Sequence, residues 1–91
     1  MELAVSVPSL LRDCTGGKSH FTLEADTLDH AMKRLLADYP LLNHHIFDEA
    51  GKLRQHVLIY YNEDNIEWLE HRQIPLQVGD KLMVLQAVSG G

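Results

Sequence analysis

The sequence predicts an α+β fold in which a mixed sheet of four to five strands carries one main helix on one face. Apolar and polar residues alternate near the N-terminus, as expected for a half-buried strand. Between residues 28 and 36 the apolar side chains instead recur with the spacing of an amphipathic helix. A chain of 91 residues is long enough for one domain with one modest core.

The sequence pattern of the N-terminal third predicts two strands joined by a short connection. Met1–Val7 should form the first strand and Ser19–Glu24 the second. Between them, Ser9–Asp13 is expected to make one turn that folds Leu10 and Leu11 back onto the core. Because a short glycine-containing loop joins them, the two strands should pair antiparallel.

One amphipathic helix should follow these strands. Asp26 or Thr27 is suited to cap its N-terminus, because a short polar side chain can accept a hydrogen bond from a free N–H group. Pro40 should end the helix at about Tyr39, since the residue before a proline avoids the helical conformation. Leu41–Phe47 is ambiguous, with a short helix as one interpretation.

The second half of the chain predicts strands at Gln55–Tyr61 and Lys81–Leu85, with a short edge strand at Ile66–Leu69. If the first and last strands pair as parallel central neighbours, the result is a β-grasp sheet with the helix on one face. Alternation then places four apolar side chains on the opposite, open face: Leu58, Tyr60, Met83 and Leu85. We call these four the open-face patch.

Contiguous exposed apolar side chains usually mark a partner site. Two alternatives to a partner site stay open for the open-face patch. Its members are either scattered surface residues or a second small core beneath a loop.

The last residues, Ala87–Gly91, predict a flexible tail that follows a β-grasp domain of residues 1–86. The six residues past Leu85, fully extended, reach roughly 20 Å, enough to enter a neighbouring protein's active site. Gly90 and Gly91 have no Cβ, so they fit a narrow channel and leave the terminal carbonyl carbon open to a nucleophile. The alternative is a frayed end, because chain termini are often disordered.

Composition restricts the classes of partner. The chain has 8 Lys and Arg against 13 Asp and Glu, a formal net charge of −5 at pH 7. The absence of a basic cluster argues against nucleic acid and anionic membranes and favours a partner with a basic surface. The single cysteine, Cys14, excludes an internal disulfide and suits a reducing compartment. Since the N-terminus shows no signal or membrane pattern, we expect a cytoplasmic protein.

No catalytic or metal site of the chain's own is expected. The six histidines lack the short spacing typical of metal ligands. Gly16-Gly17-Lys18 lacks the spacer and hydroxyl residue of a phosphate loop. Cys14 has only Arg12 and Lys18 nearby in sequence to lower its pKa, so surface or structural roles are favoured over a reactive thiolate.

Several segments together resemble the ubiquitin-like sulfur-carrier family of the ThiS/MoaD type. Besides the helix position, the resemblance rests on Val7–Arg12, Thr15–Gly17, Asp26–Leu28, Gly51–Leu53, Leu76–Asp80 and Ala87–Gly91. It covers the whole chain, and within the family these segments look most like the thiocarboxylate carriers of bacterial cysteine biosynthesis. Carriers that supply homocysteine, siderophore, thiamine or molybdopterin synthesis are similar too.

The resemblance implies that the tail is the reacting group. An E1-like adenylyltransferase would use ATP to convert the Gly91 carboxylate to an acyl-adenylate, which a sulfur donor would convert to a thiocarboxylate. Gly90 would thread the enzyme's channel, with Ala87, Val88 and Ser89 in contact with the partner.

The resemblance also implies which partners and cofactors are involved. Met83 and Leu85 fall where the family keeps an apolar docking surface beside the tail, and alternation places Leu58 and Tyr60 on the same face. In the cysteine-type pathway a PLP-dependent synthase would accept the sulfur, and a zinc metalloprotease would trim the product. ATP, PLP and zinc would then belong to partners, and the chain itself would be a carrier that binds no cofactor.

Three alternative functions stay open. The first is a ubiquitin-like modifier joined through Gly91 to target lysines, and the second is the small subunit of molybdopterin synthase. The third is an interaction module with an inert tail.

Overall fold

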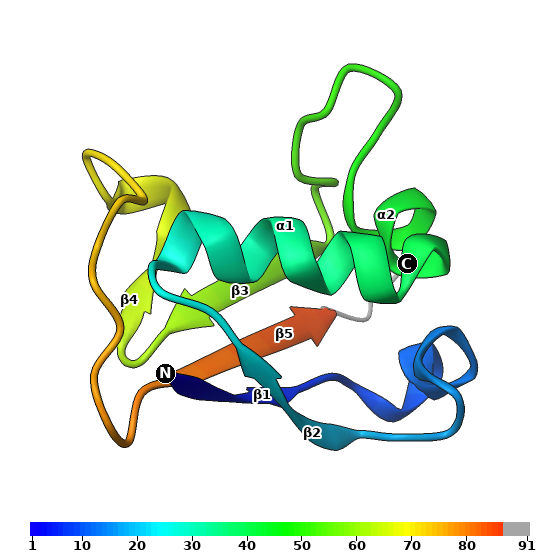
Figure 1. The fold of residues 1–91 in the computed structure, drawn as a ribbon. Coiled ribbons are helices and arrows are strands. Elements are labelled where there is room, and N and C mark those ends of the chain that lie inside the picture. Colours follow the sequence, from blue (N-terminus) through cyan, green and yellow to red (C-terminus); the bar gives the residue numbers. More distant parts are fainter. Residues whose placement is uncertain (87–91) are drawn as a thin grey trace.

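The two α-helices lie on one side of a single mixed sheet (Figure 1). The fold comes from a computed structural model that describes residues 1–86; residues 87–91 lie outside the described part. The elements are β1 (Glu2–Ser6), η1 (Ser9–Thr15), β2 (His20–Glu24), α1 (Leu28–Asp38), α2 (Pro40–Ile46), β3 (Val57–Tyr61), β4 (Asp64–Asn65), η2 (Ile66–Trp68) and β5 (Lys81–Gln86), where η1 and η2 are 3₁₀ helices.

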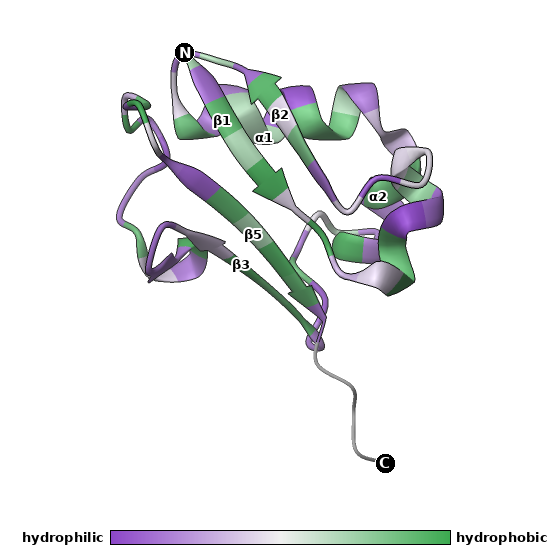
Figure 2. Ribbon diagram, turned by 90° about the horizontal axis from the view of Figure 1, so that it is seen from below, coloured by the Kyte–Doolittle hydropathy of each residue, from purple (hydrophilic) through white to green (hydrophobic). Residues whose placement is uncertain are grey.

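The strand order in the sheet is β2-β1-β5-β3-β4. The first and last strands, β1 and β5, are parallel neighbours at the centre, and every other pair is antiparallel. Figure 2 views this sheet from the face opposite α1. The predicted β-grasp arrangement is therefore confirmed.

Local signals define the two helices. The Thr27 hydroxyl oxygen accepts a hydrogen bond from the His30 N–H at 3.1 Å and caps α1, as predicted. α1 ends at Asp38, and Pro40 starts α2 at a position where no N–H is needed. The ambiguous segment after Tyr39 is thus a short helix.

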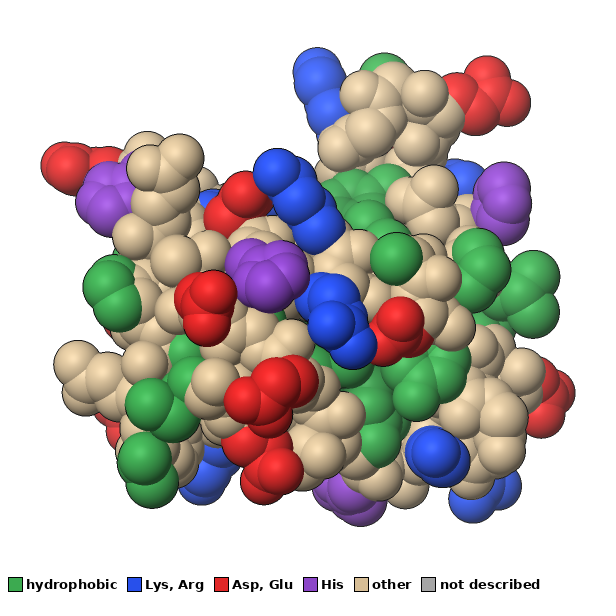
Figure 3. Space-filling view, in the orientation of Figure 1, with side chains coloured by type: hydrophobic (Ala, Val, Ile, Leu, Met, Phe, Trp, Pro, Cys, Tyr) green, Lys and Arg blue, Asp and Glu red, His purple; other side chains and the backbone are tan. Residues whose placement is uncertain are grey.

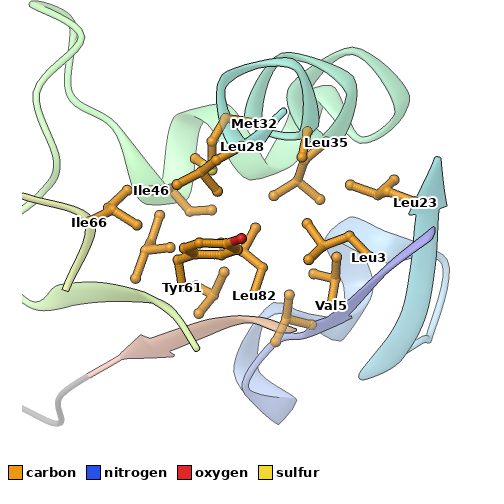
Figure 4. Close-up of a cluster of buried hydrophobic side chains, with 14 of the residues drawn as sticks. Leu3, Val5, Leu23, Leu28, Met32, Leu35, Ile46, Tyr61, Ile66 and Leu82 are labelled. Atoms are coloured by element: carbon orange, nitrogen blue, oxygen red, sulfur yellow. The ribbon is translucent and has the colours of Figure 1, made fainter. Parts of the chain in front are cut away.

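One hydrophobic core fills the space between α1 and the sheet (Figure 4). Alternate residues of each strand enter it, so β3 buries Val57, Ile59 and Tyr61 while β5 buries Leu82 and Val84. These five inward positions agree with the period-two pattern of the sequence. The same alternation leaves the intervening residues of β3 and β5 on the open face.

The edge strand predicted at Ile66–Leu69 is wrong. The edge strand β4 comprises only Asp64 and Asn65, and residues Ile66–Trp68 form η2 instead. The cause is a local cap: the Asn65 side-chain oxygen accepts a hydrogen bond from the Glu67 N–H at 2.9 Å. This bond favours a turn of helix over continued strand pairing.

The prediction that both Leu10 and Leu11 fold onto the core is wrong for one of them. Leu11 is 2% exposed, whereas Leu10 is 69% exposed. Both belong to η1, in which successive side chains point about 120° apart because a 3₁₀ helix has about three residues per turn. With Leu11 directed into the core, the side chain of Leu10 is therefore turned towards solvent.

Candidate functional site

The open-face patch is a contiguous surface on the two strands nearest the C-terminus. Leu58 on β3 lies directly opposite Leu85 on β5, and Tyr60 lies opposite Met83 in the neighbouring row. Met83 is 40% exposed and Leu85 38% exposed, while the two β3 residues are half-buried. Because pairs two residues apart on one face are in contact range, the four side chains form one surface. They are therefore neither scattered nor buried beneath a loop.

A shallow groove continues this surface across β5, β1 and β2. Its volume is about 480 Å³. The open-face residues that line it are Ala4, Ser6, His20, Thr22, Lys81 and Met83. The groove exists because β1 and β2 place small side chains between larger ones. The sequence alone does not reveal it, because the small outward side chains form a groove only where β2, β1 and β5 lie side by side.

The helical side of the molecule has a different character. Over α1, basic and acidic side chains lie close together (Figure 3). Two of these pairs are ion pairs one helical turn apart, Lys33 with Asp29 at 3.1 Å and Arg34 with Asp38 at 3.7 Å. Such exposed pairs contribute little to stability but keep the surface hydrated. The open sheet face is therefore the better surface for an apolar partner.

The start of β5 is fixed by a hydrogen-bond cluster around Asp80. Its carboxylate accepts hydrogen bonds from the Tyr61 hydroxyl, from the Gln77 N–H at 2.9 Å and from the Asn62 side-chain amide at 3.3 Å. Asn62 also accepts a hydrogen bond from the Lys81 N–H at 3.0 Å. The cluster joins the end of β3 to the start of β5, and so helps to hold the register of the open-face patch.

The cluster shifts the pKa values of its two acidic groups. Burial raises the pKa of Tyr61 to about 12, assisted by the hydrogen bond to Asp80 and its negative charge. Burial alone would also raise the pKa of Asp80, but the hydrogen bonds from Tyr61, Gln77 and Asn62 outweigh it and lower that pKa. Tyr61 thus stays protonated, and therefore a donor, over the range in which Asp80 titrates.

We expect the substitution Asp80→Asn to remove an acid-sensitive contribution to stability. Because the pKa of Asp80 is lower in the folded state, its carboxylate stabilises the fold at pH values above the unfolded-state pKa of 3.8. That contribution is lost as the pH falls through the folded-state pKa. The melting temperature of Asp80→Asn should therefore be furthest below that of the natural chain at neutral pH, and the gap should close in acid. Glu63→Gln, at an exposed acid in the same region, is the control. A gap that does not depend on pH would contradict this account.

Other polar groups do not assemble into a reactive site in the described part. Cys14 is half-buried at the end of η1, and burial together with the charge of Asp13 raises its thiol pKa, which disfavours the reactive thiolate. Among residues 1–86, no three His, Cys, Asp or Glu side chains gather closely enough to hold a metal ion. No helix in that range has the length and hydropathy needed to cross a membrane.

The five predicted tail residues lie outside the described part of the chain: Ala87, Val88, Ser89, Gly90 and Gly91. Their roles stay predictions. The structure does show where the described part of the chain ends. β5 ends at Gln86, which pairs with Val57 directly after the Leu58–Leu85 row. The last described residue is therefore next to the open-face patch.

Comparisons with known proteins agree with this architecture. The profile of the ThiS family matches residues 5–91. Sulfur carrier protein CysO of Mycobacterium tuberculosis is 32% identical over 93 residues, covering all of both chains. The fold matches a chain of the Amycolatopsis orientalis BexX/CysO complex with a TM-score of 0.78 at 25% identity, over 98% of this chain and 99% of that one.

A third similarity is to small archaeal modifier protein 1 of Methanosarcina acetivorans. That solution structure has a TM-score of 0.72 and 29% identity, over 99% of this chain and 96% of that one. The strand order, the single main helix and these matches define a ubiquitin-like β-grasp protein. The chain belongs to the ThiS family and is a sulfur carrier of that family.

Proposed function

We propose that this chain carries sulfur as a thiocarboxylate on Gly91 and delivers it for the synthesis of cysteine or a related sulfur-containing metabolite. The observation that carries the proposal is the family match, which extends through Gly91. The similarity to CysO over the full length favours the cysteine branch. The chain is in this proposal a co-substrate that binds no cofactor, with ATP, PLP and zinc held by partner enzymes.

The proposed chemistry takes place at the terminal carbonyl carbon. A carboxylate oxygen of Gly91 attacks the α-phosphorus of ATP on an E1-like adenylyltransferase, and pyrophosphate leaves. Sulfide, or a sulfur donor equivalent to it, then adds to the carbonyl carbon and AMP leaves with the bridging oxygen. The product is a thiocarboxylate, in which sulfur has replaced one carboxylate oxygen. A tail that ends in two glycines presents no side chain that would obstruct the nucleophile.

Intact mass spectrometry tests this chemistry directly. The chain is incubated with its cognate adenylyltransferase, ATP and sulfide, and its mass is expected to rise by the difference between sulfur and oxygen. Omission of ATP is the control and should leave the mass unchanged. An unchanged mass in the complete reaction, with an enzyme proven active on this chain, would refute the proposal.

The open-face patch is the proposed docking surface for the adenylyltransferase. It is apolar, and its exposed half, Met83 and Leu85, lies on β5 directly before the tail. Docking here would place the tail beside the enzyme's active site. The net charge of −5 favours a partner that surrounds this contact with basic residues and would speed encounter at low salt.

We expect Leu85→Glu and Met83→Glu each to weaken binding of the adenylyltransferase by about tenfold or more, because a charge would be desolvated against an apolar surface. Both side chains are exposed in the free chain, so the fold should be retained. Val78→Glu is a matched control, since Val78 is 88% exposed and lies in the turn before β5. Calorimetric titration gives the affinities, and equal affinity for all three variants would show that the enzyme uses another face.

A second candidate function is attachment to other proteins. The similarity to small archaeal modifier protein 1 favours it, because the same acyl-adenylate can react with an amine in place of sulfur. Immunoblots against the chain distinguish the two functions in cells. A series of bands of higher mass that disappears when Gly91 is removed would support conjugation to other proteins. A single band of the free chain would support sulfur delivery alone.

A further inference from the structure

The outer strand β2 has a free edge. Val7 N–H donates to Ser19 O at 2.9 Å, and Ala25 N–H donates to Met1 O at 3.0 Å, so the odd-numbered residues of this strand face β1. Antiparallel strands alternate the direction of their backbone groups. The even-numbered residues His20, Thr22 and Glu24 therefore point their N–H and C=O groups away from the sheet, and none of these groups has a backbone partner in the described part.

This edge is complementary to itself. We propose that two copies of the chain pair reversibly through β2 in antiparallel orientation, with the twofold axis at Thr22. In that register His20 lies opposite Glu24 of the second copy, and Thr22 lies opposite its own counterpart. His20, Thr22 and Glu24 each direct their N–H and C=O groups to the free edge, so in this register each of these groups gains a hydrogen-bond partner on the second copy. The two five-stranded sheets would become one continuous sheet.

Side chains on the open face match in this register. At each end of the contact the His20 imidazole lies opposite the Glu24 carboxylate, to which a ring N–H can donate a hydrogen bond. Threonines are a favourable pair directly opposite each other. The Glu24 carboxylate also accepts a hydrogen bond from the Met1 ammonium group at 2.8 Å, an exposed contact that the pairing can keep.

Side chains on the helical side match as well. There Phe21 lies opposite Leu23 of the second copy. Phe21 is only half-buried in the free chain, where the centroid of its ring lies 4.9 Å from the centroid of the Tyr39 ring. Pairing would bury more of this aromatic surface, which adds an apolar contribution to the backbone hydrogen bonds. A shift by two residues would remove backbone partners and, depending on its direction, place Glu24 or His20 beyond the end of the opposite strand.

The contact is small, because only one strand of five residues from each copy takes part. We therefore expect a weak and reversible dimer, at the lower end of specific interfaces. β1 separates β2 from β5, so the open-face patch stays available to another protein in either state. The inference is thus independent of the proposed sulfur chemistry.

Sedimentation velocity over a range of chain concentrations tests the pairing. The natural chain should shift from monomer to dimer as the concentration rises. Thr22→Pro removes an N–H group that would pair with the second copy, so it should abolish the shift. The fold should be retained, because proline is tolerated where the N–H of an edge strand faces solvent. Thr22→Val keeps the backbone group and should retain the dimer. A monomer at every concentration, or a dimer that survives Thr22→Pro with its fold intact, would overturn the proposal.

A charge series tests the register even if the proline variant fails to fold. His20→Lys places a full positive charge opposite Glu24 of the second copy, and His20→Glu places like charges there. We expect the dissociation constant of His20→Glu to exceed that of His20→Lys by about fivefold or more, since the contact occurs twice. Equal constants, or the reverse order, would contradict the register.

Discussion

Removal of Gly91 is expected to reduce thiocarboxylate formation at least about 100-fold, because the shortened chain would hold its carboxylate one residue away from the position that the partner enzyme requires. The truncated chain still ends in a glycine carboxylate. A loss of thiocarboxylate formation would therefore result from the changed position of that carboxylate and not from the absence of a reacting group. Conversion is measured by intact mass spectrometry under the conditions used for the natural chain.

Thermal unfolding provides the control for this truncation. Every residue of the described core lies between Leu3 and Val84, so the melting temperature should not change. Conversion at the natural rate would show that the reacting position is not set by tail length. A lost thermal transition would instead show that Gly91 takes part in folding.

The second large effect is expected in the centre of the sheet. Leu82 lies on β5, is 0% exposed and belongs to the core beneath α1 (Figure 4). Leu82→Ala removes buried methyl groups and leaves a cavity, which should lower the free energy of unfolding by about 2–5 kcal/mol. In a domain of this size that is a large share of the total stability.

Met83, which follows Leu82 on β5, provides a matched control. Met83 is 40% exposed on the open face, so Met83→Ala should cost about 1 kcal/mol or less. Urea unfolding followed by circular dichroism gives both values. Equal losses for the two variants would mean that the faces of β5 are assigned incorrectly, and the open-face patch would then lose its basis.

Much of the fold could be predicted from local patterns. The alternation in β3 and β5 identified which side chains enter the core, since a strand has only two faces. The proline after Tyr39 correctly marked the end of α1. The errors arose where one side-chain hydrogen bond or one turn geometry decided the outcome, as at Asn65 and at Leu10. A hydrophobic pattern does not contain that information.

The open-face patch shows the limit of sequence analysis more clearly. Its four members could be predicted to share a face, but their contact depends on the register of β3 against β5, which places Leu58 opposite Leu85. That register is supported by the cluster around Asp80, whose partners Tyr61 and Asn62 are distant from it in sequence. The groove beside the patch was missed because small side chains give no signal until the neighbouring strands are known.

The most direct test of the account uses a chain whose terminal carboxylate is replaced by an amide. A semisynthetic chain with Gly91 as the carboxamide keeps the same length, core and open-face patch but has no oxygen anion to attack ATP. We expect it to bind the adenylyltransferase with the affinity of the natural chain and to release no pyrophosphate. Pyrophosphate release and sulfur uptake by the capped chain at the natural rate would contradict the claim that the chemistry occurs at the terminal carbon of Gly91.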